Sequence, residues 1–334
     1  MKAIVWTKYG SPDVLQLRDV DKPQPKDNEL LIKIHATTVT IGDCEMRRFK
    51  YPMIMGLLVR MYIGIRKPTR ITVLGMELAG EVEAVGSGVT KFKPGDEIFG
   101  STGFGFGAYA EYVCIPEDAD SSDDGSITHK PTNLTFEESA IIPVGADTAL
   151  FFIRTQGNVQ PGQKVLIYGA SSSVGSYAVQ LAKHFGAEVT AVCSASNHEW
   201  VKELGADKMI DYRTEDFTKS GETYDAIFDA VGKLSLFGSM KALKEGCVFL
   251  DAVHMMRRSV QAKFATMRSN KRILGGTATG VTEDLVFFKE LIEGGKLKPV
   301  IDRRYPLEEI VEAHRYVETG RKKGNLIITV IDSN

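Results

Sequence analysis

Hydrophobic and polar positions follow two different periods in the two parts of the chain. In the first part they alternate with the two-residue period of strands, over residues 3–7, 15–20 and 30–39. Residues 71–100 repeat this pattern between glycines, and a further strand runs from 112 to 116. The first part of the chain is therefore expected to be all-β.

The second part of the chain alternates short apolar runs with helical patterns. Residues 165–168 form an apolar run of the length that a parallel strand needs when both of its faces are buried. Apolar positions then recur at helical spacing from Val174 to Ala182. Further strands are expected at 188–193, 208–212, 225–231, 247–253 and 272–276, with helices at 199–204 and 234–243. This alternation is typical of an α/β fold with a doubly wound parallel sheet.

A turn of small residues, Gly169 to Gly175, separates the first of these strands from its helix. Backbone N–H groups in such a turn can approach a pyrophosphate, whose charge the helix N-terminus also attracts. The dinucleotide-binding fingerprint G-x-G-x-x-G would place a second glycine at position 171, where the chain has Ser171. Read alone, the turn therefore also fits an ordinary strand–helix connection. The strands and helices that follow favour a dinucleotide-binding domain.

Composition adds bounds on the class of protein. A chain of 334 residues suggests about two domains, and 43% hydrophobic and 25% charged residues are ordinary for a soluble globular enzyme. The net charge of −2 gives no support for binding to nucleic acid or membrane, and no apolar run is long enough to span a bilayer. The N-terminus leads into a strand without the apolar core of a signal peptide, so a cytoplasmic location is expected. The four cysteines, Cys44, Cys114, Cys193 and Cys247, lie far apart and are read as reduced thiols.

Three motifs of the first part resemble the medium-chain dehydrogenase/reductase superfamily. They are G-M-E-x-A-G-x-V-x-x-V-G at 75–86, F-K-P-G-D-x-x-x-G at 92–100 and G-x-Y-A-E-Y at 107–112. The turn GASSSVG and the following SYAVQLAK resemble the zinc-free branch of that superfamily, the quinone oxidoreductase-like or zeta-crystallin-like enzymes. Glycines are typical in that branch where Ser172 and Ser173 stand here. The likeness covers essentially the whole chain.

The resemblance implies two domains. Residues 1–145 and 282–334 would form a GroES-like β-barrel domain, and residues 146–281 a Rossmann domain that binds NADP(H). The polar run at 120–126 is expected to be a solvated loop. The family's habit of pairing Rossmann sheets edge to edge implies a homodimer, with its contact near 271–280.

The zinc-dependent relatives bind a catalytic metal through a cysteine, a histidine in a G-H-E motif and a third ligand. Here Met76 takes the place of that histidine, and Thr40 takes the place of the cysteine. A thioether is a poor zinc ligand, and the single thiol of nearby Cys44 cannot form a site. The four-cysteine structural zinc lobe is absent as well. No bound metal is therefore expected.

Without a Lewis acid, the substrate itself must accept the developing charge. A quinone or an α,β-unsaturated carbonyl does so, and the resemblance implies NADPH-dependent hydride transfer to such a substrate. A second hypothesis is an NADPH-binding sensor or scaffold protein with little turnover, which the serines of the turn and Thr40 keep open. A third hypothesis, alcohol dehydrogenation, is disfavoured by the missing zinc ligands.

NADP(H) is expected in preference to NAD(H). An NAD enzyme commonly has an acid at the tip of the second strand for the ribose 2′-hydroxyl, whereas the tip here, Cys193 to Asn197, has none. The family's NADP(H) binders have a tyrosine at the position of Tyr212. For the nicotinamide end, the resemblance implies Thr148, whose hydroxyl is equally compatible with a bond to its own helix backbone. The expected cofactor contacts are Thr148, Gly169, Ser171, Ser172, Ser173, Val174, Gly175, Ser194, Ser196, Asn197, Tyr212, Val231, Gly276, Thr277, Lys323 and Asn325.

No catalytic residue is assigned from the sequence, and the candidates are Asp43, Arg47 and His254. Asp43 and Arg47 lie one helical turn apart and are expected to pair with each other in a structural role. His254 follows the fifth strand of the Rossmann series, close to where a substrate cleft should open. Residues 51–70 mix methionines and tyrosines with arginines, so they form either an apolar rim of that cleft or a loop packed on the barrel.

Overall fold

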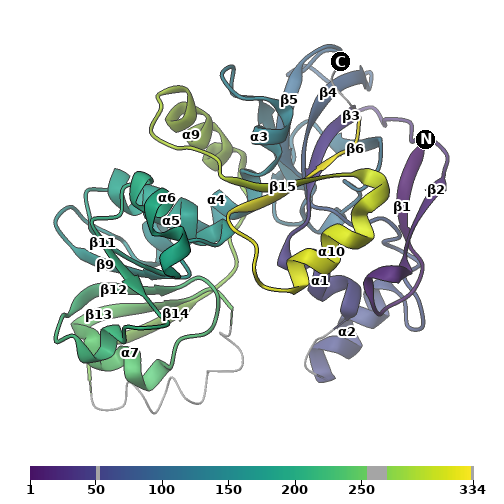
Figure 1. Ribbon diagram of the computed structural model, residues 1–334. Helices are drawn as coiled ribbons and strands as arrows, with labels where there is room; N and C mark the ends of the chain where they lie inside the picture. Colours follow the sequence, from purple (N-terminus) through teal and green to yellow (C-terminus); the bar gives the residue numbers. More distant parts are fainter. Residues whose placement is uncertain (50–52, 254–268, 332–334) are drawn as a thin grey trace. The chain divides into compact units, whose positions relative to one another are not determined.

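The computed structural model describes residues 1–49, 53–253 and 269–331, which divide into two compact units (Figure 1). The first unit comprises Met1–Val144, Gly280–Glu293 and Pro299–Asn334. The second comprises Gly145–Thr279 and Gly294–Lys298. Both ends of the chain therefore belong to the first unit.

Strands dominate the first unit, as the alternating pattern predicted, but the first part of the chain is not all-β as expected, because helices lie at 41–48, 53–63 and 136–140. β1 (Lys2–Trp6) and β2 (Leu15–Asp19) form an antiparallel pair. A larger sheet has the strand order β15-β16-β3-β4-β5-β8-β7, and β6 also pairs with β3. Its strands are β3 (Glu29–Thr38), β4 (Glu77–Val85), β5 (Glu97–Ser101), β6 (Tyr112–Pro116), β7 (Asp120–Ser121), β8 (Gly125–His129), β15 (Ile301–Pro306) and β16 (Asn325–Thr329).

Helices join the N-terminal and C-terminal segments of this unit into shared hydrophobic cores. The helices are α1 (Ile41–Arg48), α2 (Met53–Ile63), α3 (Phe136–Ala140), α9 (Thr282–Glu293) and α10 (Ile310–Glu318). One core combines Trp6 and Leu74 from the first part of the chain with Val317 and Ile328 from the tail. The hydrophobic burial of the tail against the N-terminal strands therefore closes the unit.

The expectation of a solvated loop at 120–126 holds only for the turn at its centre, where Asp123 and Asp124 are exposed, because both ends of the segment are strands. β7 and β8 pair antiparallel across a tight turn, and the side chain of Ser126 is buried. Gly125 closes this hairpin at a φ of +92°, a conformation that favours glycine. A two-residue strand of polar residues leaves no hydrophobic alternation in the sequence, so the pattern concealed it.

In the described residues of the second unit, six parallel strands form one sheet in the order β11-β10-β9-β12-β13-β14. They are β9 (Lys164–Tyr168), β10 (Glu188–Cys193), β11 (Lys208–Asp211), β12 (Tyr224–Asp229), β13 (Leu243–Asp251) and β14 (Arg272–Gly275). Counted along the chain, this order is third, second, first, fourth, fifth and sixth, and it reverses between β9 and β12. The predicted doubly wound sheet is therefore confirmed.

Helices cover both faces of this sheet. α5 (Ser173–His184) and α6 (His198–Glu203) lie on one face, and α7 (Leu236–Ala242) lies on the other (Figure 1). α4 (Pro143–Leu150) continues into a π-helical segment at 151–156, where Phe152 stacks on Phe228 with ring centroids 5.0 Å apart. Because the strands are parallel, the loops that follow them meet at one edge of the sheet.

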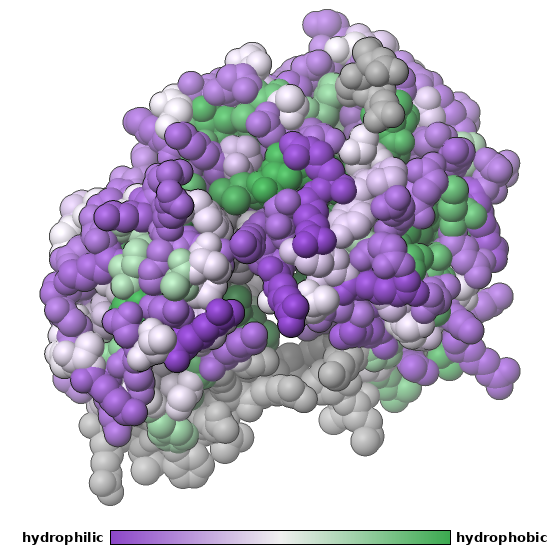
Figure 2. Space-filling view, in the orientation of Figure 1, coloured by the Kyte–Doolittle hydropathy of each residue, from purple (hydrophilic) through white to green (hydrophobic). Residues whose placement is uncertain are grey.

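Hydrophilic side chains cover most of the face drawn in Figure 2, and hydrophobic side chains show in smaller areas. Among the helices that the structure describes, α5 and α9 are the longest, with 12 residues each. No helix in residues 1–49, 53–253 and 269–331 is long and apolar enough to cross a bilayer.

Candidate functional site

The turn after β9 is held tight by two glycines. Gly169 has a φ of +81°, and its N–H donates to the carbonyl of Val192 at 3.0 Å. A Cβ at position 169 would lie 2.6 Å from the side chain of Val231, and one at position 175 would lie 2.1 Å from the carbonyl oxygen of Gly169. The turn therefore packs so closely against its own backbone and against Val231 that a side chain fits at neither position.

The serines of the turn start helix α5. Ser172 is its N-cap residue, and the Ser172 hydroxyl accepts a hydrogen bond from the N–H of Gly175 at 3.1 Å. The hydroxyl of Ser176 donates to the carbonyl of Ser173 at 2.9 Å. The serine that stands in place of a typical glycine thus fixes the helix N-terminus, whose partial positive charge faces the turn.

The loop after β10 is a small hydrogen-bonded network. The hydroxyls of Ser194 and Ser196 lie 3.1 Å apart, and the Asn197 amide nitrogen donates to the Ser194 hydroxyl at 3.2 Å. The Asn197 amide oxygen accepts from the indole of Trp200 at 3.4 Å. Ser194 and Asn197 are buried, whereas Ser196 is exposed. Of the expected contacts in this loop, Ser196 presents its side chain to solvent and Asn197 holds the loop in shape.

Aromatic and cationic side chains follow β9 and β11. The register places Tyr168 beside Val192 and Asp211 beside Cys193, so Tyr212 stands next to the loop after β10. The ring of Tyr212 is 49% exposed and lies 6.3 Å from the ring of Tyr168. The guanidinium of Arg213 lies 5.8 Å from the Tyr212 ring centroid. The tyrosine rings give this surface an aromatic face, and the Arg213 guanidinium gives it a positive charge.

Asp211, which the sequence analysis did not weigh, ends β11 near this surface. Its carboxylate accepts the backbone N–H of Arg213 at 3.0 Å. Hydrogen bonds from the backbone of Arg213 and of Ala195 lower the pKa of Asp211. The Asp211 carboxylate therefore holds the backbone of the loops after β10 and β11 in place.

The loop after β12 is organised by Asp229, a residue that the sequence analysis missed. Its buried carboxylate accepts four backbone N–H groups, those of Val231, Gly232, Lys233 and Leu234, at 2.8–3.3 Å. This arrangement holds Val231 against the turn at Gly169. The signal in the sequence was an acid at the carboxyl end of an otherwise apolar strand.

Replacing Asp229 by alanine is expected to lower the free energy of unfolding by about 2–4 kcal/mol, because buried N–H groups would lose their acceptor. Urea unfolding followed by fluorescence measures this change. Lys233→Ala, at an exposed position of the same loop, is the control and should shift the free energy by about 0.5 kcal/mol or less. Equal effects of the two substitutions would contradict the assigned role of Asp229.

Three expected nicotinamide contacts also belong to the second unit. Gly276 follows β14, and a Cβ there would lie 2.7 Å from the ring of Phe151. Thr277 is exposed, and Thr148 is half-buried in α4. The structure thus brings the turn at 169–175, Ser194 to Asn197, Tyr212, Val231 and Gly276 to the carboxyl edge of one sheet.

Lys323 and Asn325 belong to the first unit, where both have structural contacts. The backbone N–H of Lys323 donates to the Asp302 carboxylate at 3.0 Å, and its side chain is exposed. The buried amide of Asn325 donates to the carbonyl of Val300 at 3.3 Å. A role of these two residues in cofactor binding stays a prediction.

The predicted pairing of Asp43 with Arg47 is wrong. The Asp43 carboxylate accepts the backbone N–H and the hydroxyl of Thr40, at 2.9 and 2.7 Å, in a capping box at the start of α1. Arg47 donates to the carbonyl of Gly10 at 2.5 Å and forms an ion pair with Glu318. The capping box directs the carboxylate back to the helix N-terminus, so it cannot reach the next turn.

A second carboxylate, that of Glu77, is buried near Asp43. It accepts the hydroxyl of Thr38 and, at 2.8 Å, the N–H of Val144. Burial raises the pKa of Glu77 to about 7, against the lowering effect of these bonds and of Lys322. Neither Glu77 nor Lys322 was among the expected site residues. The signal for Glu77 was its place in the G-M-E motif.

Cys44 and His314 form a buried neutral pair. The thiol sulfur lies 3.3 Å from Nδ1 of His314. Burial raises the pKa of Cys44 to about 12 and lowers the pKa of His314 to about 3. A thiol and an imidazole in these states provide neither a thiolate nucleophile nor a proton-transfer couple at neutral pH.

These donors do not fit zinc. Cys44 is hydrogen-bonded to His314, Thr40 caps α1, and Glu77 is hydrogen-bonded to Thr38 and Val144. Within the part of the chain that the structure describes, no three His, Cys, Asp or Glu side chains are grouped as a metal site requires. His254, the third catalytic candidate, lies outside the described residues.

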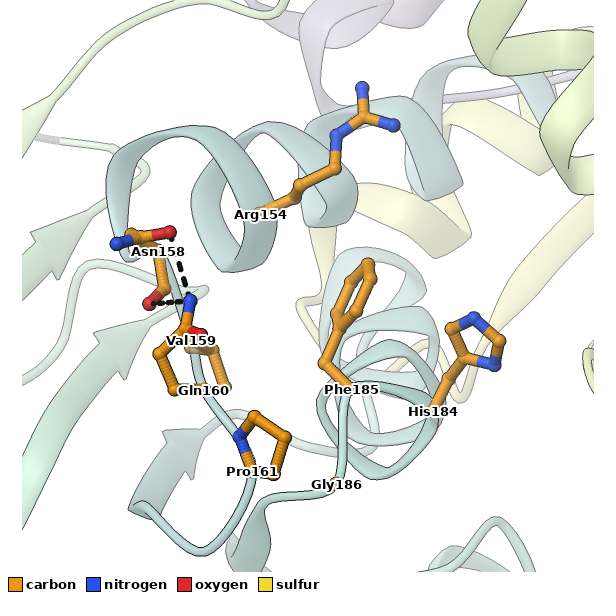
Figure 3. A pocket seen from close by; sticks show the side chains of 8 residues that line it. All are labelled: Arg154, Asn158, Val159, Gln160, Pro161, His184, Phe185 and Gly186. Carbon is orange, nitrogen blue, oxygen red and sulfur yellow. Dashed lines mark hydrogen bonds between the residues drawn. The ribbon is translucent and has the colours of Figure 1, made fainter.

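A hollow of about 440 Å³ lies at the other edge of the Rossmann sheet (Figure 3). Arg154, Asn158, Gln160, His184 and Phe185 line it, and the Gln160 amide donates to two oxygens of Asn158, both at 3.0 Å. These residues precede β9 and β10, whereas the glycine turn follows β9. The hollow is therefore separate from the candidate nucleotide site.

The chain matches two family models. Residues 26–120 match the alcohol dehydrogenase GroES-like domain, and residues 204–328 match the model described as zinc-binding dehydrogenase. The first match confirms the GroES-like fold that the sequence implied. The second match extends from the parallel sheet of the second unit into the C-terminal tail.

Named relatives extend over nearly the whole chain. The 2-methylene-furan-3-one reductase of Solanum lycopersicum is 34% identical over 98% of this chain and 79% of that protein. The chloroplastic NADPH-dependent alkenal/one oxidoreductase of Arabidopsis thaliana is 30% identical over the same shares, 98% and 79%. The structure of the quinone oxidoreductase from Coxiella burnetii has a TM-score of 0.86, 32% identity and 99% coverage of both chains.

Proposed function

Because this chain belongs to the medium-chain dehydrogenase/reductase superfamily, we propose that it transfers hydride from NADPH to a quinone or to the C=C bond of an α,β-unsaturated carbonyl, without zinc. The names of the relatives, a 2-methylene-furan-3-one reductase, an alkenal/one oxidoreductase and a quinone oxidoreductase, support this substrate class. In this structure, the proposal depends on the glycine and serine turn at the carboxyl edge of a doubly wound sheet.

The residues of the second unit fit a dinucleotide. Gly169 and Gly175 keep the turn tight, so its backbone can face a pyrophosphate, and α5 adds the positive end of its dipole. Tyr168 and Tyr212 offer ring faces to the adenosine end. Bound NADPH would supply the hydride, and the protein would position the acceptor and exclude water.

The preference for NADPH over NADH is supported by the groups beside the tip of β10. Ser196 offers a hydroxyl there, and Arg213 offers a positive charge for a 2′-phosphate. Asp211, the carboxylate closest along the sheet, has its oxygen occupied by the backbone of Arg213. An NAD enzyme would need such an acid directed at the ribose.

The assembly and location that the sequence implied remain part of this proposal. β14 ends the described sheet on one side, so its edge is open to pairing with a second copy of the chain. We propose a homodimer joined there and a cytoplasmic location. Analytical ultracentrifugation of the purified protein tests the dimer.

The test of function is binding followed by turnover. NADPH and NADH are titrated into the purified protein, and NADPH oxidation is then followed by absorbance with 1,4-benzoquinone and with a medium-chain enal. Tight NADPH binding with turnover supports the reductase. Tight binding without turnover on any acceptor favours a nucleotide sensor, and zinc-dependent oxidation of an alcohol would revive the dehydrogenase.

Arg213→Ala is expected to raise the Kd for NADPH about 5- to 10-fold and to leave the Kd for NADH within about twofold, because only the former carries a 2′-phosphate. Fluorescence titration with each nucleotide measures both constants. Arg18→Ala, at an exposed position of β2 in the first unit, removes the same charge away from the tip and should change neither. An equal loss for both nucleotides would show that Arg213 does not select between them.

A further inference from the structure

The segment that contains α2 has an unusual charge distribution. Between Met53 and Met76 the sequence has four arginines and lysines, Arg60, Arg66, Lys67 and Arg70, and no aspartate or glutamate. The whole chain, with 41 basic and 43 acidic residues, is nearly balanced. The net charge, on which the expectation of no membrane binding was based, therefore conceals a strongly cationic stretch.

α2 also exposes an apolar face. Gly56 and Ile63 are buried, and Val59 packs against the core of the first unit. On the opposite side, five large apolar side chains, each 52–67% exposed, occupy one face of the helix and the turn after it: Leu57, Leu58, Met61, Tyr62 and Ile65. Their spacing of one, three and four residues is that of a single helix face. In Figure 1, α2 lies at the lower margin of its unit.

Cations flank this face on a fixed framework. Arg66, Lys67 and Arg70 are exposed in the segment after α2, and the Arg70 guanidinium lies 4.0 Å from the Tyr62 ring centroid. The helix end is held in place, since the Tyr9 hydroxyl donates to the carbonyl of Gly64 at 2.5 Å and the N–H of Thr69 donates to Ile63 at 2.9 Å. The apolar residues and the cations thus keep a constant arrangement.

Independently of the nucleotide site, we propose that α2 and residues 64–70 dock this protein on the surface of a bilayer that contains anionic lipid. Leu57, Leu58 and Met61 would enter the boundary of the acyl chains, and Arg66 and Lys67 would face the headgroups. The 11 residues of α2 are too few to span a bilayer but suffice for an interfacial helix. This face contributes no residue to the hollow of Figure 3 or to a smaller one lined by His35 and Phe136.

Vesicle co-sedimentation of the full chain tests the proposal. The protein is expected to sediment with vesicles that contain about 30% phosphatidylserine in phosphatidylcholine, and to remain in the supernatant with phosphatidylcholine alone. Binding should weaken in high salt, which screens the headgroup charge. No sedimentation with the anionic vesicles, or equal binding to both kinds, would overturn the proposal.

Two variants separate the contributions of the apolar and the cationic side chains to vesicle binding. Each is expected to lower the partition constant between vesicles and solution about tenfold or more. One is Leu57→Ser with Leu58→Ser and Met61→Ser, and the other is Arg66→Glu with Lys67→Glu. Phe237→Ser, at a 55% exposed apolar position of α7, is the matched control and should bind as the parent does. Unchanged thermal unfolding and NADPH affinity show that the variants are folded.

Enzyme kinetics test the alternative that this segment forms an apolar rim of the substrate cleft. If the serine variant raises KM for a long-chain enal and the parent does not bind vesicles, the face belongs to the substrate site and the proposal is overturned. Since vesicle binding is measured without nucleotide or substrate, failure of the docking proposal leaves the reductase proposal unaffected. Likewise, failure of the reductase proposal leaves the docking proposal unaffected.

Discussion

Gly175→Ala is expected to raise the Kd for both NADPH and NADH by about 100-fold or more. The added Cβ would lie 2.1 Å from the carbonyl oxygen of Gly169 and 2.9 Å from the Cα of Ala170, both backbone atoms that cannot move aside alone. The turn must open, and the Ser172 cap on the N–H of position 175 is then lost. The pyrophosphate would no longer face an ordered helix N-terminus.

Fluorescence titration measures the two constants, and circular dichroism shows that the variant remains folded. Gly238→Ala is the matched control, because its Cβ would meet its nearest neighbour at an ordinary 3.5 Å within helix α7. This control should bind as the parent does and is expected to be stabilised slightly. Nucleotide binding by Gly175→Ala within about threefold of the parent would refute the role given to the turn.

A stability maximum near pH 5 to 6.5 is the second expected result, set by two buried groups that titrate in opposite directions. The pKa of His314 is lowered to about 3, from an unfolded value of 6.5. Its contribution is therefore complete above pH 6.5 and is lost as the pH falls toward 3, because the unfolded state binds the proton first. The loss is on the order of 5 kcal/mol.

Glu77 acts on the alkaline side. Its pKa is raised to about 7, from an unfolded value of 4.5, so its contribution is complete below pH 4.5 and is lost as the pH rises to about 7. The loss is on the order of 3 kcal/mol. Burial also raises the pKa of Asp43, which adds to the decline on this side.

Urea unfolding between pH 4 and pH 8 measures both slopes, and one variant removes each. Glu77→Gln keeps an acceptor for the N–H of Val144, so stability should go on rising up to about pH 6.5 and the decline above that pH should be reduced. His314→Phe keeps a ring against Tyr109 and should flatten the acid decline, although the lost contact with Cys44 lowers stability overall. A monotonic profile in the parent would exclude this balance.

Much of the fold could be predicted because it depends on local patterns. Strand and helix alternation determines a doubly wound sheet, and the order of β9 to β14 agrees with it. The hairpin of β7 and β8 was missed, since two polar residues carry no period. The sequence analysis treated Ser172 as a departure from a glycine motif. In the structure, the Ser172 side chain caps the N-terminus of α5.

The buried polar contacts of the first unit were beyond reach of the sequence for a different reason. Arg47 was paired with Asp43 by helical spacing, but its partner, Glu318, is 271 residues away along the chain. Asp43 could have been recognised as the third helical position of a capping box, because Thr40 precedes it by three residues. Long-range pairs of this kind depend on which elements pack together.

The state of the cysteines has a consequence for the proposed substrates. Quinones and α,β-unsaturated carbonyls are soft electrophiles that alkylate thiolates. Burial raises the pKa of Cys44 and Cys193 to about 12 and of Cys114 to about 11, and the pKa of Cys247 is raised as well. At neutral pH, each of the first three is ionised in on the order of one molecule in ten thousand or fewer. The fold thus protects the protein from covalent self-inactivation by the compounds that it is proposed to reduce.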